Sequence, residues 1–95
     1  MGIDSEGTLV FEKELNGIEG ETLFGALQKN EIQMEYDEFA FGVLLNSIEN
    51  LYPKENEYIA LYVNDEYANE GISSLKIGDG DEFTFKIEKI ESFLG

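Results

Sequence analysis

The hydrophobic positions of the chain are most concentrated in two short segments, residues 58–63 and 82–87. Successive side chains of a β-strand point to opposite faces, so both segments are typical of strands. Segment 58–63 is apolar on both faces, which predicts a central strand, whereas 82–87 alternates between apolar and polar residues. The residues between them are rich in Gly, Asn and Asp, and we expect tight turns there.

The rest of the pattern predicts one helix and three further strands. Residues 21–30 carry an apolar stripe at helical spacing, formed by Leu23, Ala26 and Leu27. We expect Gly25, inside this helix, to mark a close approach to the sheet. The other expected strands are 8–15, 32–39 and 41–48.

Two of these strands have distinct patterns. Segment 32–39 alternates strictly and is predicted to be a half-exposed edge strand. Its edge fits either the recruitment of a partner strand or the ordinary protection of an edge by charge. Segment 41–48 fits a buried strand or a short helix, and its Gly and Val residues favour the strand.

The order of elements predicts a single α+β domain over residues 1–95, with its core in about 8–88. We expect one helix on a mixed or antiparallel sheet of about five strands, in a β-grasp-like arrangement. Asn16-Gly17 is the strongest turn signal after the first strand. Residues 1–6 and 91–95 are expected to be flexible ends.

The charge balance restricts the function. There are 21 acidic and 6 basic residues, giving a formal net charge of −15. This balance argues against nucleic acid and anionic membranes as partners, and leaves cationic partners and metal ions open. A strongly solvated surface is the plainer explanation of the same charge.

The chain contains no Cys and no His, which excludes disulfides, thiolate or imidazole metal sites and a Ser-His-Asp triad. No apolar run approaches the length of a membrane span, so we expect no membrane insertion by this domain. With so many acids, pairs of carboxylates approach by chance, and no feature of the sequence selects one pair for acid–base chemistry. We therefore expect no enzymatic activity.

Two groups of residues are candidates for binding. Tyr58 and Tyr62 share one strand face and would supply stacking area and hydroxyl donors, or else pack across strands with solvated hydroxyls. Asp79 and Asp81 could contribute oxygen ligands to Ca²⁺, or could simply belong to an ordinary turn before a strand.

Four segments of the chain, in order, resemble the DUF4430 family, a module related to the C-terminal β-domain of transcobalamin and intrinsic factor. The matches are GETLFGAL, FGVLLNSIENL, YIALYVND and GISSLKIGDGDEFTF, at residues 20–27, 41–51, 58–65 and 71–85. The resemblance implies a β-grasp-like fold of the soluble-ligand-binding type. It also implies an extracellular or cell-wall setting in Gram-positive bacteria.

The resemblance also indicates where a ligand would lie. It implies a rim formed by the strand of Tyr58 and Tyr62 and by the loop from Asn64 to Gly71, and it names cobalamin as a candidate cofactor. Ile59 stands where the family usually has Trp, and this removes the flat side chain best suited to a corrin edge. Asp65 stands where the family usually has Gly.

We therefore predict a non-catalytic, monomeric, extracellular module of a bacterial surface or secreted protein that binds a small molecule or a protein. The alternative is a structural or adhesive spacer domain that has no small-molecule ligand. A Ca²⁺-stabilised module is a third hypothesis.

Overall fold

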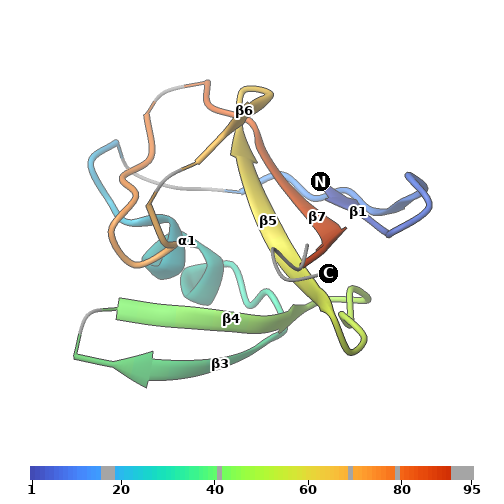
Figure 1. Cartoon of the computed structure of the whole chain (residues 1–95). Coiled ribbons are helices and arrows are strands. Elements are labelled where there is room, and N and C mark those ends of the chain that lie inside the picture. Colours follow the sequence, from blue (N-terminus) through green and yellow to red (C-terminus); the bar gives the residue numbers. More distant parts are fainter. Residues whose placement is uncertain (16–18, 41, 69, 79, 91–95) are drawn as a thin grey trace.

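A mixed five-stranded sheet in the order β2-β1-β7-β5-β6 forms the centre of the fold (Figure 1). The computed structural model describes residues 1–15, 19–40, 42–68, 70–78 and 80–90. β1 runs parallel to β7, and the other pairings in this sheet are antiparallel. Its strands are β1 Gly2–Ile3, β2 Leu9–Phe11, β5 Glu57–Val63, β6 Glu66–Tyr67 and β7 Phe83–Lys89.

The pairing of β5 with β7 is the longest in this sheet and confirms both strands expected from the hydrophobic pattern. It runs from Glu57 opposite Lys89 to Val63 opposite Phe83. Leu61 lies opposite Phe85, and both are buried in the core. The residues next to Leu61 in β5 and next to Phe85 in β7 therefore face the other side of the sheet.

Helix α1, Leu23–Lys29, confirms the predicted helix. Leu23, Ala26 and Leu27 are buried, as their spacing predicts. Thr22 caps the N-terminus, where its hydroxyl accepts a hydrogen bond from the Gly25 N–H at 3.1 Å. The expected approach of Gly25 to the sheet is wrong: a Cβ at Gly25 would lie 3.2 Å from Thr22 Oγ1, so the close neighbour is the cap.

A separate two-stranded sheet is formed by β3, Met34–Phe39, and β4, Gly42–Ile48. The structure thus confirms that segments 32–39 and 41–48 form strands. The prediction that they belong to the same sheet as the other strands is wrong, because they pair only with each other within the described residues. β3 begins two residues later than expected, because Ile32 lies in the core with its N–H bonded to the Leu27 carbonyl. Phe41 lies outside the described residues.

The N-terminal residues differ from the expectation of a flexible end. β1 lies between β2 and β7, and the Met1 amino group donates to the Phe83 carbonyl at 2.8 Å. Phe85 N–H in turn donates to the Met1 carbonyl. The first strand expected at 8–15 is shortened to the three residues of β2. The turn expected at 16–17 and the end expected at 91–95 lie outside the described residues.

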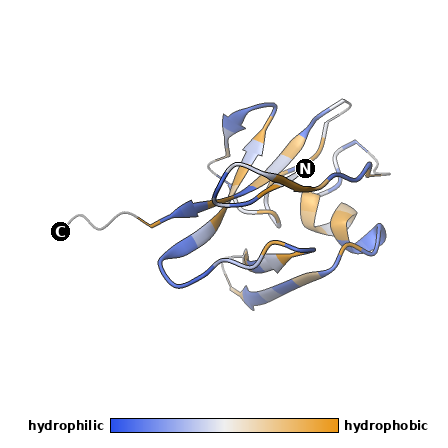
Figure 2. Cartoon of the chain, turned by 90° about the vertical axis from the view of Figure 1, so that its right-hand side faces the viewer, coloured by the Kyte–Doolittle hydropathy of each residue, from blue (hydrophilic) through white to orange (hydrophobic). Residues whose placement is uncertain are grey.

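The core lies on one face of the main sheet, between that sheet, α1 and the β3–β4 hairpin (Figure 1). Figure 2 shows hydrophobic segments where the helix and the strands face one another, and hydrophilic segments along β3. Within the described residues, no helix has the length and hydropathy needed to cross a bilayer. The buried core cluster consists of Leu23, Leu27, Ile32, Ile48, Leu51, Leu61, Ile72, Phe85 and Ile87.

Candidate functional site

The face of β5 and β7 opposite the core carries three tyrosines and a glutamate, here called the tyrosine–glutamate cluster: Tyr58, Tyr62, Tyr67 and Glu88. The strand register assembles them, because Tyr58 lies opposite Glu88 and Tyr62 lies opposite Tyr67. In β5 and β7 these positions alternate with the core residues Leu61, Phe85 and Ile87 and therefore project away from the core.

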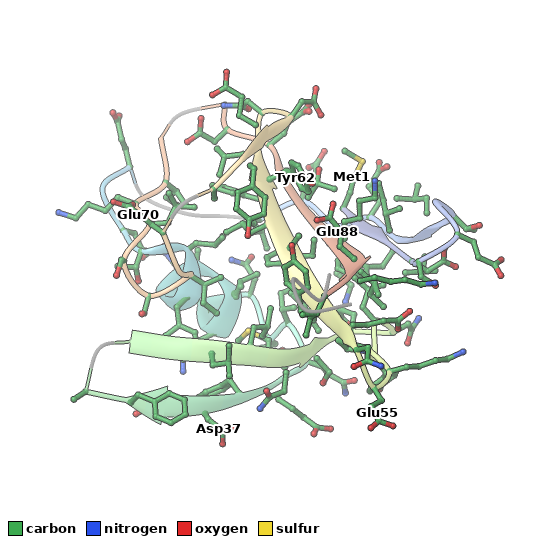
Figure 3. All side chains as sticks on the ribbon, in the orientation of Figure 1. Met1, Asp37, Glu55, Tyr62, Glu70 and Glu88 are labelled. Atoms are coloured by element: carbon green, nitrogen blue, oxygen red, sulfur yellow. The ribbon has the colours of Figure 1, made fainter. Side chains whose placement is uncertain are left out.

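Both carboxylate oxygens of Glu88 accept hydrogen bonds from tyrosines. The Tyr58 hydroxyl donates to Oε1 at 3.2 Å, and the Tyr62 hydroxyl donates to Oε2. Figure 3 shows Tyr62 and Glu88 projecting from the neighbouring strands β5 and β7. The rings of Tyr62 and Tyr67 meet edge to face, with their centroids 5.6 Å apart. Ala60, between the two β5 tyrosines in the strand, is only 1% exposed, which shows that this part of the face is covered.

The environment of the cluster raises the pKa of two of its tyrosines, Tyr58 and Tyr62. A hydrogen bond with Tyr67, followed by burial and by the bond to Glu88, raises the pKa of Tyr58 to about 12. The hydrogen bond to Glu88, followed by burial, raises the pKa of Tyr62. Both hydroxyls therefore remain neutral hydrogen-bond donors at physiological pH.

Glu88 is held by neutral groups rather than by a cation. Within the described residues the salt bridge that forms is between Lys13 and Glu49, away from this face. The two hydroxyls fix the position of the Glu88 carboxylate and leave its net negative charge in place. A half-buried anion of this kind, beside aromatic rings, is a suitable place for a cationic group.

Tyr58 and Tyr62 are the two predicted rim residues that the structure brings together. Asn64 lies in the adjacent turn, where its side-chain amide donates to Asp81 and its side-chain oxygen accepts from the Glu82 N–H, both at 2.9 Å. Gly71 lies on the core side of the sheet, where a Cβ would meet the Val43 carbonyl oxygen at 3.7 Å. In Figure 3 the neighbouring Glu70 lies near α1, away from Tyr62.

Of the two predicted metal ligands, Asp81 lies in the turn before β7. Asp79 lies outside the described residues. Asp81 accepts hydrogen bonds from the Gly78 N–H at 2.8 Å on one oxygen and from Asn64 at 2.9 Å on the other. Among the residues that the structure describes, no group of three acidic side chains is placed to hold a metal ion. The described contacts of Asp81 are those of a turn.

The sequence interpretation missed Glu88 and Tyr67, although the pattern contains a signal for each. The alternation of the last strand places Glu88 on the polar face with Lys86. A two-residue turn at Asn64-Asp65 pairs Tyr67 with Tyr62 by counting alone. The interpretation did not single out Glu88 among the polar residues of the last strand, and it left the short β6 unassigned.

Comparison with known proteins bears on the fold and the family. The chain is similar to a solved structure, that of a proposed metal-binding protein from Ruminococcus gnavus, with a TM-score of 0.75 and 15% identity over 93% of this chain and 91% of the other. At this level of identity the likeness shows a shared fold. Comparison with curated proteins gives no match.

The family comparison covers most of the elements described above. The model of a domain of unknown function, DUF4430, matches residues 20–89, which include α1, both strands of the hairpin sheet, and β5, β6 and β7. The match confirms the resemblance found in the sequence segments. The chain therefore belongs to the DUF4430 family.

Proposed function

We propose that this domain is a non-catalytic binding module that holds an ammonium group of its ligand at the tyrosine–glutamate cluster. The observation that carries the proposal is the state of Glu88. Two neutral tyrosine hydroxyls hold its carboxylate, and no cation among the described residues is bonded to it. The arrangement fixes a negative charge on an aromatic surface without neutralising it.

The aromatic rings add a second attraction for the same ligand group. A cation within about 6 Å of a tyrosine ring face gains about 0.5–2 kcal/mol, depending on how far it is desolvated. Tyr67 is 52% exposed, so part of this surface is accessible to a ligand. The net charge of −15 further favours a cation over an anion in the encounter.

The remaining parts of the functional hypothesis rest on the family. Membership of DUF4430 supports a binding role and, through the sequence resemblance, an extracellular setting and a β-grasp fold related to cobalamin-binding β-domains. The Ruminococcus gnavus protein is described as metal-binding, which for the present chain supports a search for cationic ligands. These assignments stay predictions, as does cobalamin.

Calorimetric titration with tetramethylammonium and methylammonium tests the proposal. The wild-type domain should bind at least one of them saturably, whereas tert-butanol, a neutral molecule of similar shape, should not bind. Glu88→Gln keeps the size of the side chain and removes its charge, so the affinity should fall about tenfold or more. Glu38→Gln removes the same charge from an exposed position of β3 and should bind like the wild type.

Circular dichroism shows whether each variant is folded. Equal affinity in Glu88→Gln and the wild type would overturn the proposal. An absence of saturable binding of either cation would overturn it as well.

A further inference from the structure

A groove of about 720 Å³ lies on the opposite side of the main sheet from the tyrosine–glutamate cluster. Its lining includes residues 11–15 and 19, residues 77, 78 and 80–82, and Phe83 and Phe85 of β7. Phe85 is buried on the core face, whereas Glu88 projects from the outer face. The groove and the cluster are therefore separate places on the molecule.

The base of the groove is apolar. Phe11, Leu15, Ile77 and Phe83 line it and are only partly buried against the core, and Leu27 of α1 lies beneath. The volume falls within the roughly 300–1,000 Å³ of ordinary small-molecule sites. Such a surface gains free energy when an apolar group displaces water from it.

The rim of the groove is acidic. Glu12, Glu14, Glu19 and Glu82 line it and are exposed. Lys13 and Met1 line it as well: the Lys13 ammonium group is paired with Glu49 at 2.8 Å, and the Met1 amino group donates to the Phe83 carbonyl at 2.8 Å. An anionic ligand would meet repulsion at this rim, whereas a cation would be attracted.

We infer that the groove binds a small amphiphilic amine, with its apolar body on the base and its ammonium group at the acidic rim. The volume, the apolar base and the excess of carboxylates at the rim each select part of this ligand. The inference concerns a second site and does not depend on the cluster, which offers a single carboxylate.

Three probes separate the contributions of the tail and the charge. Decyltrimethylammonium carries both, decyl sulfate carries the same tail with the opposite charge, and tetramethylammonium carries the head group alone. The two decyl compounds are titrated into the ¹⁵N-labelled domain below their critical micelle concentrations, and tetramethylammonium is titrated in the same way. We expect decyltrimethylammonium to bind saturably and to shift the amide signals of Phe11, Leu15, Ile77 and Phe83. Decyl sulfate and tetramethylammonium should leave these signals unchanged.

Matched variants test the rim. Glu14→Gln with Glu19→Gln should weaken decyltrimethylammonium binding about threefold or more. Glu35→Gln with Glu38→Gln removes the same charge from exposed positions of β3 and should leave binding unchanged. Glu88→Gln should also leave it unchanged, which separates this site from the cluster.

Three results would overturn the inference: a lack of saturable binding, equal binding of decyl sulfate, or signal shifts that avoid the groove. Equal weakening by both double variants would do so too, because it would indicate a general effect of net charge. The rim variants remove exposed side chains, so their fold is expected to persist and is checked by the same spectra.

Discussion

Tyr62 and Glu88 are 26 residues apart in the sequence, and the hydroxyl of Tyr62 donates a hydrogen bond to the Glu88 carboxylate. On β7, the residue directly opposite Tyr62 is Thr84, whereas Glu88 lies opposite Tyr58. The Tyr62 side chain must therefore extend along the strand to reach its partner, and Ala60, which lies between, is almost fully buried. The hydrogen bond from Tyr62 to Glu88 thus links β5 to β7 and also holds in place the one carboxylate of the cluster.

Replacing Tyr62 with Phe should lower the free energy of unfolding by about 1–2 kcal/mol, because a hydrogen bond to a charged group is lost while the ring remains. Tyr52→Phe is the matched control, since Tyr52 is 61% exposed and should change stability by less than about 0.5 kcal/mol. Urea denaturation measures both. Equal stability of the two variants would show that the Tyr62–Glu88 contact contributes little.

Stability should fall at alkaline pH because of Tyr58. Its pKa is about 12 in the folded domain, above the ordinary value of 10.0 that applies to the unfolded chain. Between these values the unfolded state binds fewer protons than the folded state, so the free energy of unfolding decreases as the pH rises. The contribution is complete below about pH 10 and is lost as the pH passes about 12.

Denaturation curves at about pH 8, 10 and 12 test this pH dependence, with the double variant Tyr58→Phe/Tyr62→Phe as control. The variant should lose less stability than the wild type over this range. Absorbance at the tyrosinate band should show a late-titrating component from Tyr58 and Tyr62 that the double variant lacks. Identical late titration in the wild type and the double variant would contradict the described hydrogen bonds.

Replacing Asp65 with Gly should raise the free energy of unfolding by about 0.5–1 kcal/mol. Asn64 and Asp65 form a two-residue turn with φ of 51° and 70°, the left-handed region in which Gly has no steric cost. Asp65→Ala removes the same charge but keeps a Cβ, so it should not stabilise. If both variants gain equally, relief of charge repulsion rather than backbone strain would be the cause.

Replacing Leu27 with Ala should cost about 2–5 kcal/mol, because the side chain is 2% exposed in the core and its loss leaves a cavity. Leu44→Ala changes the same atoms on β4, where the side chain is 54% exposed, and should cost less than about 0.5 kcal/mol. Thermal and urea unfolding compare the two. Similar losses would contradict the position of the core beneath α1.

The sequence allowed those parts of the fold that depend on local pattern to be predicted. The apolar stripe of Leu23, Ala26 and Leu27 locates the helix, and alternation locates β5 and β7. β1 could not be found in this way, because two residues carry no periodicity and their parallel partner in β7 is more than 80 residues away. The division into two sheets depends on tertiary packing and has no local signal.

The site was predictable in part for the same reason. Tyr58 and Tyr62 share a face by the strand period alone. Their common partner Glu88 is one of 21 acidic residues, and only the register of β5 with β7 distinguishes it from the others. The family resemblance predicts Gly71 at the rim of a ligand site, whereas in the fold Gly71 lies on the core side of the sheet, near the Val43 carbonyl.

The most direct test of ammonium binding at the cluster is a nuclear Overhauser experiment on the domain with tetramethylammonium. We predict contacts from the ligand methyl protons to the rings of Tyr58, Tyr62 or Tyr67, and their loss in Glu88→Gln. Contacts that persist in Glu88→Gln, or that are confined to other surfaces at a saturating ligand concentration, would contradict the proposed function.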